Sequence, residues 1–87
     1  MKAQEAVVVR ILTIMREKNM SLSKLSARSG VAKSVLHGTL TGKPPRVRNT
    51  SIVTIQRLCQ AFDMTLRDFF DDAIFTNVEY YEDDERL

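Results

Sequence analysis

Apolar residues recur along this chain at the three- and four-residue spacing of amphipathic helices, and no sustained two-residue alternation occurs before residue 73. Val7, Ile11 and Ile14 follow the helical spacing near the amino terminus. They predict a first helix over about residues 4–18, with one apolar stripe turned toward a core.

Two short helices are predicted after a break at residues 19–21. Ser21 has the side chain of an N-cap for a second helix over about residues 22–29. Gly30 can adopt the left-handed conformation that ends a helix, and a third helix follows over about residues 33–40.

A fourth and a fifth helix complete the pattern. Either Thr50 or Ser51 can cap the fourth, whose apolar face comprises Ile52, Ile55, Leu58, Cys59 and Phe62. Thr65 and Asp68 have the spacing of a capping box at the start of the fifth helix. Its side chains expected to close the core are Leu66, Phe69 and Phe70. The chain is therefore predicted to be all-α and compact, with five helices.

Beyond Asp72 the pattern fits two structures. Phe70, Ile74, Val78 and Tyr81 have the spacing of a continued helix, whereas residues 78–80 also fit a short strand. Both readings stay open, and the acidic residues 79–85 are expected to be solvated, with disorder beyond Glu82.

Charge is divided sharply along the chain. Residues 1–62 hold eleven bases and two acids, and residues 63–87 hold nine acids and two bases. No acid occurs between Glu17 and Asp63. A basic stretch without carboxylates suits a surface that faces a polyphosphate, because each acid would repel that ligand. Solvated helix faces are the plainer interpretation.

Composition points to one small soluble domain in a reducing cytoplasm. The chain has 87 residues, of which 44% are hydrophobic and 28% charged. Cys59 is the only cysteine, so no internal disulfide can form. The longest apolar run, residues 6–9, is too short to span a bilayer, and the amino terminus lacks the pattern of a secretory signal.

Catalytic chemistry is not expected. The chain has one His and one Cys, no metal-ligand spacing and no glycine-rich phosphate loop. Cys59 falls on the apolar face of the fourth helix, where a core position is the usual role. We therefore expect no enzyme, no metal site and no cofactor.

The most specific feature is the pair of short helices joined at Gly30. The residues positioned to pack the pair together are Leu22, Leu25, Val31, Leu36 and Thr39. In a helix-turn-helix, a small residue permits the tight turn and the second helix lies in the major groove of DNA. This motif directs attention to the outward face of residues 33–40.

Residues 21–36, which read Ser-Leu-Ser-Lys-Leu-Ser-Ala-Arg-Ser-Gly-Val-Ala-Lys-Ser-Val-Leu, resemble the helix-turn-helix of the phage repressor and Cro type, the XRE family. Residues 41–43, Thr-Gly-Lys, resemble the end of that family's third helix. Residues 49–55 and 66–72 resemble its fourth and fifth helices.

This resemblance implies a lambda-repressor-like DNA-binding domain over residues 1–72, followed by a short acidic extension over residues 73–87. It also implies a regulator of transcription in a prokaryotic or phage-related cytoplasm, with repression favoured over activation.

The resemblance further implies which side chains meet DNA. Those expected to contact bases are Lys33, Ser34, His37 and Gly38, and those expected to contact phosphates are Ser21, Ser23, Lys24, Arg28, Lys43, Arg46 and Arg48. Lys33 can donate to guanine or to a phosphate, and Gly38 would permit close approach to the backbone. His37 as an exposed residue without a role, Gly38 as a neutral position and a solvated loop over residues 43–48 are the alternatives.

Partners follow from the same resemblance. One recognition helix reads few base pairs, so a homodimer on a palindromic double-stranded operator is expected. Val8 and Leu12 lie off the inward stripe and are candidate dimer contacts, as is the carboxyl-terminal end. The acidic extension could repel DNA or bind another protein. An antitoxin-like or adapter protein is the main rival function; RNA binding is disfavoured because no aromatic residue interrupts the basic stretch before Phe62.

Overall fold

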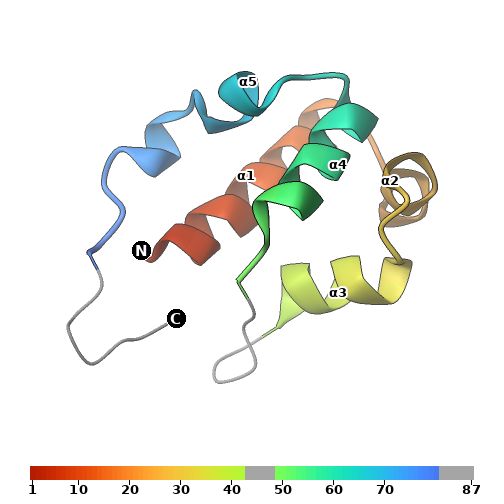
Figure 1. The fold of residues 1–87 in the computed structure, drawn as a ribbon, viewed down its shortest axis with the longest axis horizontal. Coiled ribbons are helices and arrows are strands. Elements are labelled where there is room, and N and C mark those ends of the chain that lie inside the picture. Colours follow the sequence, from red (N-terminus) through yellow and green to blue (C-terminus); the bar gives the residue numbers. More distant parts are fainter. Residues whose placement is uncertain (43–48, 81–87) are drawn as a thin grey trace.

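The computed structural model describes residues 1–42 and 49–80, and within them the chain is helical, with no strand. Five α-helices are followed by one 3-10 turn (Figure 1). Their bounds are α1 Ala3–Glu17, α2 Leu22–Ser29, α3 Lys33–Thr41, α4 Ile52–Phe62, α5 Leu66–Phe70 and η1 Ala73–Phe75. The prediction of an all-α fold with five helices is confirmed. No helix among the described residues is long and apolar enough to cross a membrane.

One apolar core joins all five α-helices. α2 packs against both α4 and α3, α1 packs against α3 and η1, and α5 packs against α4 (Figure 1). The largest side chains with almost no exposed surface are Ile11, Ile14, Leu25, Leu36, Leu58, Cys59, Phe62 and Phe69. They come from every α-helix, so each helix contributes to a core that fixes the others.

Short polar side chains begin three of the helices, as their spacing predicts. The hydroxyl oxygens of Ser21, Ser51 and Thr65 accept from the backbone N–H three residues ahead, at 3.1, 3.1 and 3.0 Å. Each bond satisfies an amide that has no partner within its helix. The capping box at Thr65 and Asp68 is confirmed.

Ser51, and not Thr50, caps α4, because Thr50 is engaged by α1. Its backbone N–H donates to Gln4 Oε1 at 2.6 Å, and Gln4 Nε2 donates to Thr50 Oγ1 at 2.7 Å. Gln4 is only 8% exposed. These two bonds fix the entry to α4 against the start of α1.

Residues 73–80 form neither a continued helix nor a strand. The short η1 turn packs its Phe75 ring against Phe70, with 5.0 Å between ring centroids, and near Phe69 at 6.1 Å. Phe70 was expected to close the core but is 38% exposed, and Phe69 fills that place. Phe69 and Phe70 occupy adjacent positions of α5, so their rings leave the helix in different directions and only Phe69 is buried.

The segment after η1 returns to the start of α1. Glu79 N–H donates to the Met1 carbonyl oxygen at 2.9 Å, and its carboxylate forms an ion pair with the terminal ammonium group. The hydrogen bond that the carboxylate accepts from the terminal ammonium group, together with the positive charge of that group, holds the pKa of Glu79 below its usual range. Glu79 is exposed, as expected of a solvated tail, but it is paired with the start of the chain; residues 81–87 of the acidic extension lie outside the described part.

Candidate nucleic-acid interface

Helices α2 and α3 form a helix-turn-helix around a left-handed glycine. Gly30 has a φ of 74°, a conformation that costs an L side chain strain. Leu25 of α2, Leu36 of α3 and Val31 between them are 0%, 1% and 8% exposed and belong to the same core cluster. The sequence prediction of a glycine turn between two packed helices is confirmed in these details.

Two serine hydroxyls hold the turn. Ser26 Oγ donates to the Val31 carbonyl oxygen at 2.7 Å, and Val31 N–H donates to Ser29 Oγ at 3.1 Å. Ser29 is buried, so its hydroxyl belongs to the turn and not to the surface. These bonds fix the angle between α2 and α3 and hence the presentation of α3.

The outward face of α3 carries the four side-chain positions proposed to meet bases. Lys33, Ser34, His37 and Gly38 are all exposed. They occupy adjacent helical positions, while Leu36 faces the core and is 1% exposed. The described residues 18–42 contain no acid, so no carboxylate on α2 or α3 neutralises the positive charge of Lys33.

Val35 is a surface position of α3 that the sequence analysis missed. It is 53% exposed and lies one turn before Gly38 and Thr39. An exposed apolar side chain on such a helix can contact the methyl group of thymine. The helical spacing could have identified Val35 as a surface position, because it falls between the outward Ser34 and the inward Leu36.

Thr41 constrains His37 at the end of α3. The Thr41 hydroxyl donates to the His37 carbonyl oxygen at 2.6 Å and lies 3.5 Å from His37 Nδ1. The hydroxyl thus lies beside the imidazole, and the His37 ring is exposed. His37 Nε2 is the ring nitrogen left to face a ligand.

Helix α2 and its N-cap carry four of the side chains that were expected to contact phosphates. Ser23, Lys24 and Arg28 are exposed. Ser21 is exposed too, but its oxygen caps the helix by accepting from Lys24 N–H. Its hydroxyl hydrogen remains available to a phosphate, next to the amide groups of the first turn of α2.

Three of the proposed phosphate contacts cannot be placed. Lys43, Arg46 and Arg48 lie outside the described residues, which stop at Gly42, after α3, and resume at Asn49, before α4. In the sequence, these three basic residues lie between the end of α3 and the N-cap of α4.

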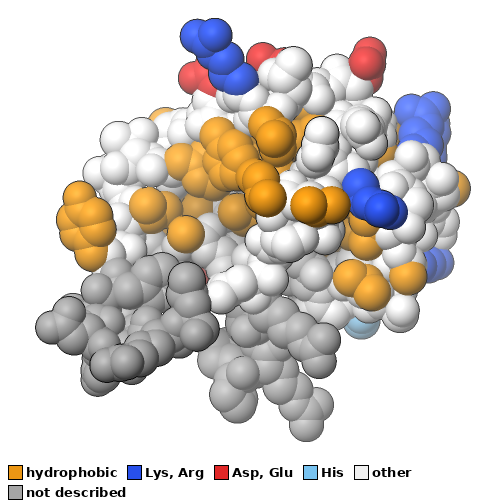
Figure 2. Space-filling view, viewed as in Figure 1, with side chains coloured by type: hydrophobic (Ala, Val, Ile, Leu, Met, Phe, Trp, Pro, Cys, Tyr) orange, Lys and Arg blue, Asp and Glu red, His pale blue; other side chains and the backbone are white. Residues whose placement is uncertain are grey.

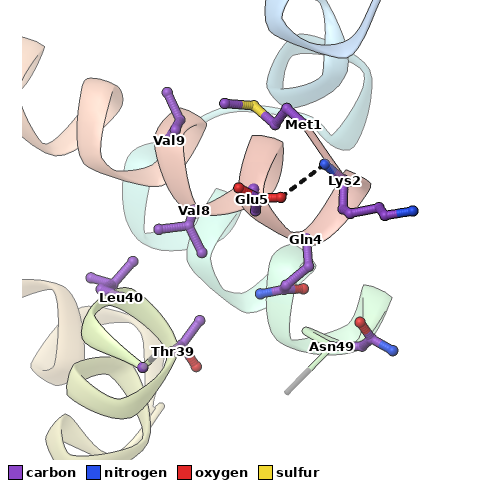
Figure 3. Close-up of a pocket in the computed structure, with 10 residues that line it drawn as sticks. Met1, Lys2, Gln4, Glu5, Val8, Val9, Thr39, Leu40 and Asn49 are labelled. Atoms are coloured by element: carbon purple, nitrogen blue, oxygen red, sulfur yellow. Dashed lines mark hydrogen bonds between the residues drawn. The ribbon is translucent and has the colours of Figure 1, made fainter. Parts of the chain in front are cut away.

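A pocket of about 470 Å³ lies between the start of α1 and the end of α3 (Figure 3). Val8 extends from α1 toward Leu40 in this view, whereas Val9 extends away from α3. Val8 is half-buried, and Leu12 is 40% exposed. The two candidate dimer residues therefore have different surroundings: Val8 lines this pocket and Leu12 faces outward.

Charge on the surface is segregated by helix. In the view of Figure 2, acidic side chains gather along the top edge, near α5, beside a basic side chain, and the other Lys and Arg side chains in view lie on the right, toward α2. Asp63, which ends α4 with a left-handed φ of 57°, begins the acidic part of the sequence. The helix-turn-helix thus occupies the basic side of the molecule.

The described residues show no alternative centre for metal chemistry. Among residues 1–42 and 49–80, no group of three or more His, Cys, Asp or Glu could hold a metal ion. Cys59 is 2% exposed, as predicted, and burial raises the pKa of its thiol.

Comparison with known families agrees with this geometry. The family described as the Cro/C1-type HTH DNA-binding domain matches residues 10–73. Neither the comparison with curated proteins nor the comparison with solved structures found a match. The matched segment covers most of α1, the whole helix-turn-helix, α4 and α5, so the chain belongs to the Cro/C1-type helix-turn-helix family of DNA-binding domains.

Proposed function

We propose that the protein binds double-stranded DNA in a sequence-specific manner and regulates transcription, as a repressor in preference to an activator. The observation that carries this proposal is the acid-free outward face of α3, held on a fixed turn and matched by a DNA-binding family. A helix of this kind fits the major groove of B-DNA.

Direct readout is assigned to the exposed positions of α3. Lys33 donates to guanine O6 or N7, Ser34 and His37 supply further hydrogen bonds, and Val35 meets a thymine methyl. Gly38 permits close approach of the DNA, because it has no side chain. The space beside it is open, since a Cβ added there would meet no described atom within 4 Å.

Phosphate contacts orient this helix on the duplex. Ser21, Ser23, Lys24 and Arg28 lie on or beside α2, and Lys43, Arg46 and Arg48 follow α3 in the sequence. Such contacts carry most of the affinity and little sequence information. A homodimer would place two recognition helices on a palindromic operator.

A selection experiment tests the proposal. Random duplexes would be bound by the full chain with competitor DNA present, and the bound pool sequenced. We expect an enriched motif, and log K falling with log salt at a slope near −0.9 per neutralised phosphate. An unenriched pool with a slope near zero would exclude DNA recognition.

A protein-binding role is the second candidate, and one surface favours it. Ile52 is 56% exposed and lines a groove with Leu66 and Phe70, with Arg67 and Asp71 at its edge. Exposed apolar grooves of this kind are typical of protein contacts. Co-purification of a single stoichiometric partner, with no motif in the DNA selection, would favour an antitoxin-like or adapter function.

A further inference from the structure

We propose that α1 pairs with α1 of a second copy in antiparallel orientation, about a two-fold axis that passes between Val9 and Leu12. This inference rests on the proposed function for its purpose, since it supplies the surface of the proposed homodimer. It makes no use of DNA contacts, so the pairing can be tested without DNA.

Four side chains form a stripe along the solvent side of α1, which we name the α1 stripe: Glu5, Val9, Leu12 and Arg16. Their spacings of four, three and four residues place them on one helical face. All four are exposed, with Val9 at 37% and Leu12 at 40%. The buried residues of this helix lie on its other sides: Gln4, Ala6, Val7, Ile11 and Ile14.

The order of the α1 stripe is symmetric about its centre. A two-fold axis between Val9 and Leu12 places Val9 of one copy against Leu12 of the other, and Glu5 against Arg16. Both ends of the contact then hold opposite charges. A parallel pairing would instead place Glu5 against Glu5 and Arg16 against Arg16, which is unfavourable. The sequence of the stripe therefore selects the antiparallel arrangement.

The two charges are available for such a contact. Within residues 1–42 and 49–80, Arg16 enters no ion pair or side-chain hydrogen bond. Glu5 uses one carboxylate oxygen to accept from Lys2 N–H at 3.0 Å, which leaves its second oxygen free to accept from a guanidinium. Pairing would therefore give both groups a partner without breaking the cap of α1.

The α1 stripe and the reading face lie on different helices. The pocket between α1 and α3 includes Glu5, Val8, Val9 and Leu40, but none of Lys33, Ser34 or His37. Val8 points toward α3 and Val9 points away from it (Figure 3). Pairing through the stripe therefore uses Val9 and Leu12, and does not require the side chains proposed to read bases.

The small size of the α1 stripe determines the strength of the dimer. Four residues from each copy bury less surface than a standard stable interface, so weak and reversible association is expected. Binding to two half-sites would then hold both copies at a high effective concentration.

Sedimentation equilibrium without DNA tests this pairing through charge reversal. Wild type should show a monomer–dimer equilibrium between micromolar and millimolar concentration. Arg16→Glu and Glu5→Arg should each weaken dimerisation roughly tenfold, because two like-charged contacts replace two opposite ones. The double variant Glu5→Arg/Arg16→Glu should restore it. Lys18→Glu, with the same charge change at an exposed position off the stripe, is the matched control and should leave the equilibrium unchanged.

Other outcomes would overturn the pairing. They are a wild type that stays monomeric at millimolar concentration, a dimer that survives Arg16→Glu, and a double variant no better than the single ones. Leu12→Asn should weaken association, while Val53→Asn on α4, 56% exposed, should not. The comparison of Leu12→Asn with Val53→Asn still tests the pairing even if Glu5→Arg unfolds the start of α1. A dimer that behaves as expected in a protein that selects no DNA motif would refute the proposed function alone.

Discussion

Arg10 of α1 forms an ion pair with Asp72, with 3.1 Å between Nη1 and Oδ2. The same guanidinium donates from Nε to the Phe69 carbonyl oxygen at 2.7 Å and from Nη2 to the Asp68 carbonyl oxygen at 2.9 Å. Its side chain is only 11% exposed. Arg10 therefore satisfies the carboxyl end of α5 and attaches that helix to α1.

Replacing Arg10 should loosen the attachment of α5. Arg10→Met retains most of the side-chain volume but leaves the Phe69 carbonyl group without the guanidinium donor, and leaves the Asp68 carbonyl group with only the Asp71 N–H, at 3.3 Å. We expect the free energy of unfolding to fall by about 1–3 kcal/mol, measured by urea denaturation. Arg67→Met, at an exposed position on α5 itself, is the control and should change it little. Equal losses in both variants would contradict a specific role for Arg10.

The two helix-turn-helix glycines should respond oppositely to alanine. Gly30→Ala forces a side chain into a φ of 74° and should lower the free energy of unfolding by about 1–2 kcal/mol. Gly38→Ala fills open space within α3 and should raise it by about 0.5–1 kcal/mol. Thermal denaturation of both variants measures the contrast.

Gly38→Ala should also separate stability from DNA binding. If the DNA backbone approaches this position, the more stable variant binds its selected duplex more weakly. Fluorescence anisotropy with that duplex measures the change. Unchanged affinity would show that Gly38 is a neutral position rather than one kept open for DNA.

Lys33 and Lys24 should differ in what they contribute to binding. Lys33→Ala should lose about 1–3 kcal/mol of discrimination at one base position, because a base donor is removed. Lys24→Ala should weaken all sequences alike and reduce the salt slope by about 0.9. Binding measured against a set of single-base variants distinguishes these patterns, and a uniform loss for Lys33→Ala would assign it to phosphate.

Acid should weaken the start of α5 through Asp68. Its carboxylate accepts from Thr65 N–H at 3.1 Å, and this bond holds the pKa of Asp68 below its usual range. A depressed folded-state pKa stabilises the fold above the usual carboxyl range, and that contribution is lost as pH falls through the depressed pKa. Asp68→Asn should therefore flatten the decline of the melting temperature in acid. Asp71→Asn, beside α5 but outside its capping box, should retain the full decline of the melting temperature in acid.

Local chemistry made much of the fold predictable. The serine and threonine caps and the Gly30 turn depend on residues within a few positions of one another, so spacing alone revealed them. The outward positions of α3 were implied by the family resemblance of residues 21–36, and their exposure agrees with it. Phe70 was misplaced because adjacent residues of a helix point in different directions, and the local pattern did not show which of Phe69 and Phe70 faces the core.

Long-range polar contacts could not be predicted in this way. Gln4 and Thr50 are 46 residues apart, and Arg10 and Asp72 are 62 apart. Each of these polar or charged residues, taken alone, is of a type that is common on solvated helix faces. Only the packing of α1 against the rest of the core brings the partners within hydrogen-bond distance.

The sequence by itself determined five helices, a helix-turn-helix and a basic stretch free of acids, because these depend on spacing and composition. Tertiary structure decided which charges serve the fold and which remain on the surface. The Arg10 guanidinium is hydrogen-bonded to the end of α5, whereas Lys33 stays exposed on α3 and Arg16 stays exposed on the α1 stripe. The physical reason is burial: a guanidinium placed beside unsatisfied helix carbonyls is bound by them, and a base on an outward face keeps its charge available to a partner.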